Sequence, residues 1–353
     1  MPGLPKNSEP SRTEADWPAL LYDNSRTGGQ GIHAARMPDQ VRWHLRVGGS
    51  VRSAPVLRNG VLYVTSMAGI LQAIDVEKGR PTWQFQAAGH IHSTPSLSGN
   101  KVLFGCDSGK VYAVDCESGK PVWEAAAAAE VWNSPVIRNG IVFFGSADTR
   151  VYAVDIDTGR NRWTQELGGR VYSTAYVGEG HLYLGCGDGK VYCLDVSSGK
   201  MIWSTATGNG IDSSPALVGD TVLIGSEDFF FYALDAGTGA VRWKYETGLG
   251  ISSSPAVFED LALVGSKDGF LYAFEIREGK LRWRVQISDV VTSPPVIASG
   301  LVCIQAGGTQ AFDITTGAVA WRAGLGGAVQ SAPVLTGDAI YVATNDGEVY
   351  ALE

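Results

Sequence analysis

The chain alternates short apolar runs of β-prone residues with turn signals, and this pattern returns with a period of about 40 residues. Residues 251–290 show one unit, in which the runs 251–257, 261–265, 271–275 and 281–286 are separated by turns. The Asp268-Gly269 pair favours a hairpin between the second and third runs, because it supplies the positive φ angles that a tight turn needs. Helical periodicity is absent. We therefore predict four antiparallel strands per unit and an all-β fold.

One tryptophan marks the fourth run of each unit. Equal steps separate the first seven of these tryptophans, and the last step is slightly shorter: Trp43, Trp83, Trp123, Trp163, Trp203, Trp243, Trp283 and Trp321. A repeat of this length with four strands per unit is typical of a β-propeller. We expect the eight tryptophans to be structural docking residues.

The two ends of the repeat predict how the ring closes. Residues 41–46 resemble a fourth strand with no unit before it, and the last unit stops at Glu353 after a third strand. Joining them completes an eighth blade and removes an open edge that would otherwise favour aggregation. We predict an eight-bladed propeller of four-stranded antiparallel blades over residues 41–353, closed by the N-terminal strand. Residues 1–40 are expected to form a tail that is partly disordered.

Composition narrows the partners and the compartment. A net charge of −8 argues against nucleic acid as the main partner. No apolar run approaches the roughly 18–20 residues of a membrane span. The five cysteines are odd in number and have no zinc spacing, so we expect neither disulfides nor structural zinc. No signal peptide is visible, which predicts a cytoplasmic protein, or a periplasmic one if a leader has been removed.

A motif at residues 233–243, Ala-Leu-Asp-x-x-Thr-Gly-x-x-x-Trp, resembles the repeat of the pyrroloquinoline-quinone-like propeller family. The resemblance covers residues 41–353, and residues 16–28 are similar to the lead-in that precedes such propellers. The family includes quinone-dependent alcohol dehydrogenases and the outer-membrane assembly lipoprotein. It implies that the tryptophan of each blade docks against the backbone of its neighbour. The motif is specific for the fold and weak for function.

Function is expected where the units differ from one another. One position, just before a recurring Ser-x-Pro element, changes from blade to blade, and the first strand of a propeller blade is the innermost. We expect these side chains to ring one mouth of the central channel: Arg52, His92, Trp132, Tyr172, Asp212, Ser252, Thr292 and Gln330. His90, Glu130 and Arg170 lie two positions earlier and add charge on the same side. The ring is either a binding site or a polar lining that solvates the channel.

A second difference lies in the second-to-third turn of the fifth blade, where Phe229 and Phe230 follow Asp228 in place of the usual Asp-Gly. This turn and the loop entering the first strand share one end of a blade. We therefore expect Phe229 and Phe230 on the same face as Trp132 and Tyr172. If exposed, they would suit a peptide or a flat organic ligand. The alternative is burial beneath the N-terminal tail.

Recurring aspartates and the two nearby histidines are the candidates for metal binding. We interpret the aspartates as turn residues that accept backbone hydrogen bonds: Asp107, Asp148, Asp188, Asp228, Asp268 and Asp346. His90 and His92 could offer two imidazoles, with Glu130 or Asp212 as further ligands, but two histidines make no site without suitable geometry. We predict no metal.

Three functions are compatible with these features. The first is a non-catalytic binding or scaffolding propeller, expected to be monomeric, that presents one face and the channel mouth to a protein or peptide partner. The second is a small-molecule-binding protein or enzyme that uses Arg52, His92, Tyr172 and Asp212. The third is a quinone-dependent dehydrogenase. It is less favoured. The resemblance implies that such enzymes have a longer chain, bound calcium and a pair of adjacent cysteines, whereas no two cysteines of this chain are adjacent. Neither pyrroloquinoline quinone nor calcium is therefore expected.

Overall fold

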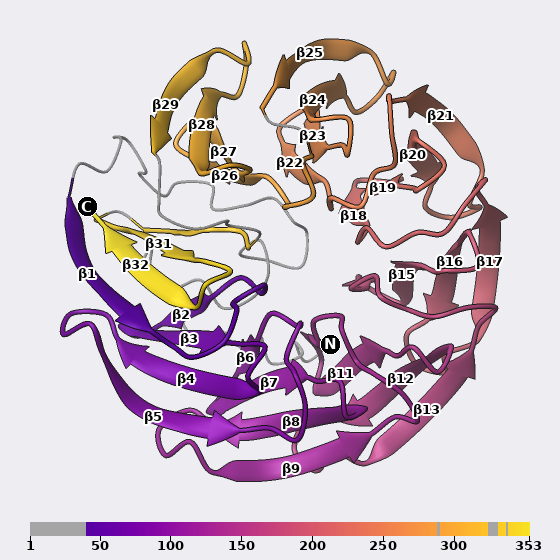
Figure 1. Cartoon of the computed structure of the whole chain (residues 1–353). Coiled ribbons are helices and arrows are strands. Elements are labelled where there is room, and N and C mark those ends of the chain that lie inside the picture. Colours follow the sequence, from indigo (N-terminus) through magenta and orange to yellow (C-terminus); the bar gives the residue numbers. More distant parts are fainter. Residues whose placement is uncertain (1–39, 288–289, 324–330, 337) are drawn as a thin grey trace, which may run out of the picture.

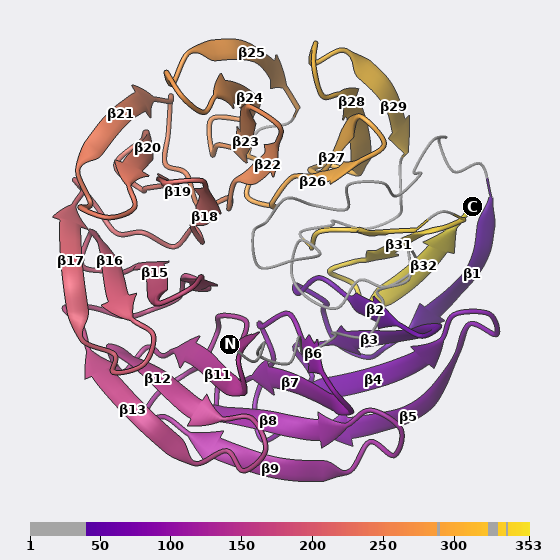
Figure 2. The ribbon, with the colours of Figure 1, turned by 180° about the vertical axis from the view of Figure 1, so that it is seen from behind.

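The computed structural model describes residues 40–287, 290–323, 331–336 and 338–353. All regular secondary structure in these residues is β-strand. They form eight four-stranded antiparallel sheets arranged as a ring (Figure 1, Figure 2). The all-β, eight-bladed propeller predicted from the repeat is therefore confirmed. Most of the predicted tail, residues 1–40, lies outside the described residues, as does the lead-in at residues 16–28.

Each blade contains four strands, ordered from the first strand nearest the centre of the ring to the fourth at the rim (Figure 1). The first strands are β2 (Val56–Arg58), β6 (Ser96–Ser98), β10 (Val136–Arg138), β14 (Tyr176–Val177), β18 (Ala216–Val218), β22 (Ala256–Phe258), β26 (Val296–Ala298) and β30 (Val334–Leu335). The second strands are β3 (Val61–Thr65), β7 (Lys101–Gly105), β11 (Ile141–Gly145), β15 (His181–Gly185), β19 (Thr221–Gly225), β23 (Leu261–Gly265), β27 (Leu301–Gln305) and β31 (Ile340–Ala343). The third strands are β4 (Ile70–Asp75), β8 (Lys110–Asp115), β12 (Arg150–Asp155), β16 (Lys190–Asp195), β20 (Phe230–Asp235), β24 (Phe270–Glu275), β28 (Thr309–Asp313) and β32 (Glu348–Leu352). The fourth strands are β5 (Arg80–Gln86), β9 (Pro121–Ala126), β13 (Asn161–Glu166), β17 (Met201–Ala206), β21 (Val241–Glu246), β25 (Leu281–Gln286), β29 (Val319–Ala323) and β1 (Val41–Arg46).

The ring closes in blade 8, where we number the blades along the chain from the sheet β2-β3-β4-β5. The strand order of blade 8 is β1-β32-β31-β30, so the N-terminal strand supplies its fourth strand. Gln40 and Glu353 exchange two backbone hydrogen bonds of 3.2 and 3.1 Å. One apolar core continues from Cys303 in blade 7 through Val349 in blade 8 to Leu62 in blade 1. The predicted closure is thus both hydrogen-bonded and packed.

The first strands are shorter than the sequence pattern suggests. In blade 6 the predicted run 251–257 is observed as a strand only from Ala256 to Phe258. The Ser-x-Pro element occupies the missing part, because proline has no N–H to donate to a strand ladder. The serine side chain makes hydrogen bonds to the second strand in place of the missing ladder bonds. In blade 2, Ser93 Oγ donates to Gly105 O and accepts from Gly105 N, both at 2.9 Å.

A chain of buried hydroxyl groups ties the first six blades together at the position after this serine. In each step a backbone N–H donates to the hydroxyl of the next blade at 2.9–3.1 Å: Ala54 to Thr94, Thr94 to Ser134, Ser134 to Thr174, Thr174 to Ser214 and Ser214 to Ser254. We call this series the hydroxyl belt. It ends at blade 6, because the residues next in register, Pro294 and Ala332, have no hydroxyl.

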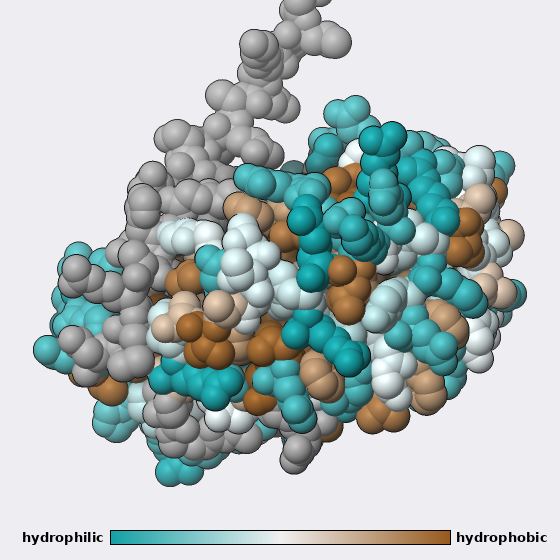
Figure 3. Space-filling view, turned by 90° about the horizontal axis from the view of Figure 1, so that it is seen from above, coloured by the Kyte–Doolittle hydropathy of each residue, from teal (hydrophilic) through white to brown (hydrophobic). Residues whose placement is uncertain are grey.

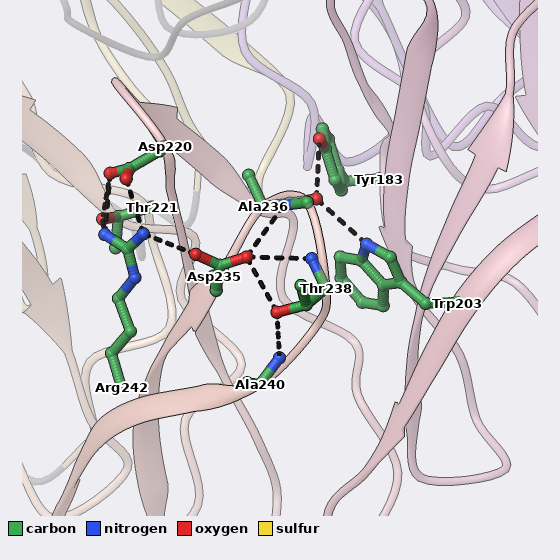
Figure 4. A network of polar contacts seen from close by, with 10 residues as sticks. Tyr183, Trp203, Asp220, Thr221, Asp235, Ala236, Thr238, Ala240 and Arg242 are labelled. Carbon is green, nitrogen blue, oxygen red and sulfur yellow. Dashed lines mark hydrogen bonds and ion pairs between the residues drawn. The ribbon is translucent and has the colours of Figure 1, made fainter.

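The fourth-strand tryptophans connect neighbouring blades at the rim. Trp203 Nε1 donates to Ala236 O of blade 5 at 2.9 Å, and that oxygen also accepts from Tyr183 Oη at 3.1 Å (Figure 4). Gly239 has φ 74°, and a Cβ there would lie 2.6 Å from the Trp203 ring, which explains the recurring glycine. The same clamp is made by Trp43, Trp83, Trp123, Trp163, Trp243 and Trp283.

Trp321 is the exception among the eight fourth-strand tryptophans. Its indole N–H is buried and has no hydrogen-bond partner within the described residues. The docking implied for all eight tryptophans is therefore observed as a hydrogen bond in seven.

An aspartate at the end of the third strand fixes the turn to the fourth strand. Asp235 Oδ1 accepts from Gly237 N, Thr238 N and Thr238 Oγ1 at 2.8–3.1 Å, and Arg242 binds Oδ2 at 2.6 Å (Figure 4). These bonds, led by the one from Arg242, lower the pKa of Asp235 to about 2. Arg242 also makes two bonds to the carboxylate of Asp220, at 2.7 and 2.6 Å.

The outer wall over blades 6 and 7 carries apolar side chains scattered among polar ones (Figure 3). Exposed valines on fourth strands include Val241 in blade 5 and Val319 in blade 7. Single exposed apolar residues of this kind are normal for a folded protein. Within the described residues, no helix has the length and apolar character needed to cross a membrane.

Candidate functional site

The loops that differ most between blades gather at one end of the ring. In blades 1–6 the second-to-third turn donates a backbone hydrogen bond to the loop entering the first strand of the same blade. Asp107 N bonds to His90 O at 2.9 Å, and Gly187 N bonds to Arg170 O at 2.8 Å. The two kinds of loop therefore share one surface, which we call the mouth face. The loop-and-turn geometry used in the sequence analysis holds for these blades.

The backbone of these loops is held by a buried aliphatic residue in each blade. Ile91, Val131, Val171 and Ile211 are at most 1% exposed and pack in the cores of the blades. The residues on either side of them are consequently turned toward the mouth. This alternation carries His90 and His92 on one loop, and Arg170 and Tyr172 on another, to the mouth face.

Four of the predicted site residues form one continuous stack across blades 2, 3 and 4. The rings of His92 and Trp132 lie 4.7 Å apart, and those of Trp132 and Tyr172 lie 4.5 Å apart with only 16° between their planes. The guanidinium carbon of Arg170 lies 5.1 Å from the centre of the Tyr172 ring. We call this the aromatic stack. The planes of His92 and Trp132 are tilted by 36°, and the Trp132 side chain remains exposed at the mouth.

Asp107 holds the aromatic stack from the side. Its Oδ1 accepts a hydrogen bond from Trp132 Nε1 at 2.6 Å and lies 3.6 Å from His92 Nε2. Partial burial lowers the pKa of His92, and the positive charge of Arg52 and the nearby His90 lower it further. Asp107 acts in the opposite direction. The net effect favours a neutral imidazole in the stack at neutral pH.

The role of Asp107 was wrongly assigned from the sequence. The true turn aspartates accept a tyrosine hydroxyl four residues ahead at 2.6–2.7 Å: Asp148, Asp188, Asp228 and Asp268. In blade 2 Ser108 occupies that position, and Asp107 stands one residue earlier, where it faces the mouth. The signal was present in the spacing, since the step from Asp107 to Asp148 is longer by one position than the steps that follow it.

The remaining predicted charges surround the stack. Arg52 is exposed, and its charge reaches His92. Partial removal from water in the mouth, followed by the charge of Glu227, raises the pKa of Asp212, although its side chain is exposed. Glu130 is half-buried on the blade-3 loop and is not part of the stack. Ser252 and Thr292 occupy ring positions in blades 6 and 7, while Gln330 lies outside the described residues.

The two phenylalanines of blade 5 do not act as a pair. Phe229 lies on the second-to-third turn and is 42% exposed on the mouth face. Phe230 begins β20 and is half-buried, with its ring covered by Lys244 Nζ at 4.1 Å and next to Tyr232. Of these two phenylalanines, Phe229 is therefore the one that adds exposed apolar surface to the mouth face.

The two histidines on the blade-2 loop diverge. His90 Nδ1 bonds to Met67 O, while His92 joins the aromatic stack. In the described part of the chain, no group of three or more His, Cys, Asp and Glu side chains has the geometry of a metal site. All five cysteines are free and buried. A cavity of about 410 Å³ opens beside the stack, with Gln86, His90 and Asp107 in its lining.

Comparison with known proteins gives a family and several solved structures of the same fold. The sequence matches the family described as outer membrane protein assembly factor BamB, over residues 25–171 and 147–353. BamB from Moraxella catarrhalis superposes with a TM-score of 0.77 at 19% identity, covering 89% of this chain and 99% of that one. The computationally designed Ika8 protein has a TM-score of 0.77 at 18% identity, covering 87% and 98%.

A quinone enzyme also shares the architecture. Quinohemoprotein alcohol dehydrogenase from Comamonas testosteroni has a TM-score of 0.82 at 16% identity, covering 96% of this chain and 80% of that one. No curated protein sequence matches the chain. At such low identities the structural likeness shows the fold alone, and the assignment to a family comes from the sequence match.

Proposed function

We propose, because the chain belongs to the family of the outer membrane protein assembly factor BamB, that it is a non-catalytic binding propeller that presents its mouth face to a protein partner. One observation carries this proposal: side chains from three successive blades are locked into the aromatic stack at an exposed end of the ring. The frame residues repeat from blade to blade, whereas the stack occurs once.

The chemistry of the stack fits a protein surface. Tryptophan, tyrosine and arginine are the residue types that carry most binding energy in protein interfaces. The rings already pack on one another, so binding would cost little further side-chain entropy. The mouth also offers the exposed cations Arg52 and Arg170.

The family description also bears on the partner and the compartment. It names an outer membrane protein assembly factor, and we propose a component of such an assembly as the partner. This supports the periplasmic alternative. The cytoplasmic location expected from the sequence as it stands finds no support in the family match.

The test is capture of partner proteins from cell-envelope extract by the full chain and by a Trp132→Ala/Tyr172→Ala variant. We expect recovery of the specific partner to fall at least tenfold, because both central rings of the stack are removed. Met201→Ala, at a position 55% exposed on the rim strand β17, is the matched control and should capture normally. An unchanged set of partners in the double variant would remove the mouth from consideration.

A small-molecule function is the second candidate, favoured by the cavity of about 410 Å³ beside the stack. The lining includes His90, Asp107 and Ser108, a different set from the Arg52, His92, Tyr172 and Asp212 first considered. Calorimetry with a panel of small carboxylic acids would test it. Binding that is lost in His90→Ala but kept in Tyr172→Ala would favour the cavity, and no heat from any acid would count against it.

A further inference from the structure

Two residues with exposed apolar side chains are linked through their backbones on the mouth face where blade 5 meets blade 6. Phe229, on the blade-5 turn, is 42% exposed, and Leu249, on the loop leading to blade 6, is 46% exposed. Thr247 Oγ1 lies 2.8 Å from Phe229 O and 2.7 Å from Leu249 O, so one hydroxyl links the two residues. We call them the Phe229–Leu249 patch.

Phe229 adopts a backbone conformation that the other blades reserve for small residues. Its φ is 78°, in the left-handed region that a residue with a Cβ disfavours, most of all when the side chain is bulky. The equivalent turn positions, with φ between 72° and 87°, are Gly69, Gly109, Thr149, Gly189, Gly269 and Gly347. A Cβ added at Gly109 would lie only 2.9 Å from loop carbonyl oxygens, so the position is crowded as well.

Phe229 remains 42% exposed in the free protein, so it keeps apolar surface that a partner could bury. Leu249 is unusual in the same way: Gly89, Ala129, Gly169 and Asn209 occupy its position in blades 1–4. Strained backbone conformations concentrate at binding and catalytic sites. An exposed aromatic ring held at such a cost points to a contact that the free protein does not make.

The charged groups around the patch leave it bordered by negative charge. Lys267 Nζ binds both carboxylate oxygens of Glu227, at 2.7 and 2.8 Å, so these two charges offset each other. Asp228 and Asp268 accept backbone N–H groups of Gly208 and Gly248, at 2.6 and 2.7 Å, and a tyrosine hydroxyl each. Because these donors are neutral, both carboxylates keep their negative charge. Charge complementarity therefore favours an apolar side chain next to basic residues as the occupant.

The patch and the aromatic stack belong to one surface. The carboxylate of Asp212 interacts electrostatically with Arg170 of the stack and also with Glu227 and Lys267, beside the patch. Resting on the proposed function, we propose that the Phe229–Leu249 patch is the anchor point for a leucine or aromatic side chain in a basic segment of the protein partner.

The experiment selects peptides from a phage-displayed random dodecapeptide library on the full chain and measures their Kd by fluorescence polarisation. Phe229→Gly should weaken the selected peptides at least tenfold, and it should raise the Tm by about 2 °C because the strain is relieved. Leu249→Asn, which copies blade 4, should weaken binding several-fold. Thr149→Gly relieves the same strain in blade 3, so its Tm should rise while peptide binding stays unchanged.

Three outcomes would overturn this inference. A lower Tm for Phe229→Gly would show that the ring stabilises the free protein. Peptides that bind Phe229→Gly and Leu249→Asn as tightly as the native chain, but lose binding in Trp132→Ala, would leave the proposed function standing and remove the patch. If no peptide binds the native chain, both the anchor and the mouth as a peptide-binding face fail.

Discussion

Two tryptophans of the ring, Trp203 and Trp132, use the same indole N–H in different ways. Trp203 donates to a backbone carbonyl of the next blade, as six other tryptophans of the ring do. Trp132 donates to the carboxylate of Asp107, a side chain that occurs at this place only in blade 2. The rim thus depends on backbone partners that seven blades supply in the same way, whereas the mouth depends on side chains that single blades supply.

This difference explains why repetition and variation in the sequence carry different information. The rim clamps, the hydroxyl belt and the turn aspartates form a frame whose partners recur in most blades. The aromatic stack depends on side chains that do not recur from blade to blade, so among the described residues it is found at one place. Substitutions in the frame should mainly change stability, and substitutions in the mouth should mainly change binding.

The largest difference is expected between the two tryptophans themselves. Trp203→Ala should lower the free energy of unfolding by about 3–5 kcal/mol, because it removes a packed ring that bridges two blades. Trp132→Ala should cost about 1–2 kcal/mol, the worth of its two ring contacts. Urea unfolding followed by circular dichroism measures both. Equal losses would show that the mouth is part of the frame.

A smaller contrast is expected between two serines. Ser134→Ala breaks the hydroxyl belt and leaves the buried N–H of Thr94 without its acceptor, at a cost of about 1–3 kcal/mol. Ser252→Ala, at a mouth position, should change the unfolding free energy by less than about 0.5 kcal/mol. The same urea titration decides the point. A loss at Ser252 as large as that at Ser134 would break the distinction.

Carboxylates of the frame and the mouth should respond to pH with opposite signs. The pKa of Asp235 is lowered from 3.8 to about 2, so its stabilising effect is present above pH 3.8 and is lost as the pH falls toward 2. The pKa of Asp212 is raised, so its ionisation opposes folding as the pH rises through that higher value. Asp235→Asn should therefore lower the Tm at pH 7, and Asp212→Asn should raise it.

The smallest expected effect is on the titration of His92. Arg52 lowers the pKa of His92 and Asp107 raises it, so Arg52→Gln should shift the midpoint upward and Asp107→Asn should shift it downward. Histidine ring signals in NMR spectra recorded across pH 4–8 would follow both variants. A shift of the same sign in both would mean that the geometry of the stack, rather than charge, sets this pKa.

The sequence predicted the frame well because most frame residues have the same surroundings from blade to blade. The tryptophan period gave the number of blades, and the unmatched strand at residues 41–46 gave the closure. The predicted first strands were too long. Proline cannot donate a ladder hydrogen bond, and in its neighbourhood the serine side chain makes the bond to the second strand instead. The period also did not reveal that the buried indole N–H of Trp321 has no hydrogen-bond partner within the described residues.

The mouth was only partly predictable, since its structure depends on contacts between blades that differ. The sequence indicated which positions vary and which face they share. It did not indicate that the rings of His92, Trp132 and Tyr172 stack on one another, because this depends on side-chain orientation. Nor did it separate Phe229 from Phe230, whose rings diverge because the first lies on the turn and the second begins a strand.

The closing strand also determines how the molecule can be tethered. Gln40 and Glu353 bond to each other, whereas the far end of β1 reaches the blade-8 turn through the bond from Val47 N to Gly347 O. Both Gln40 and Glu353 therefore lie at the end of the ring opposite the mouth face. A linker attached at either residue would hold the propeller with its mouth face pointing away from the point of attachment.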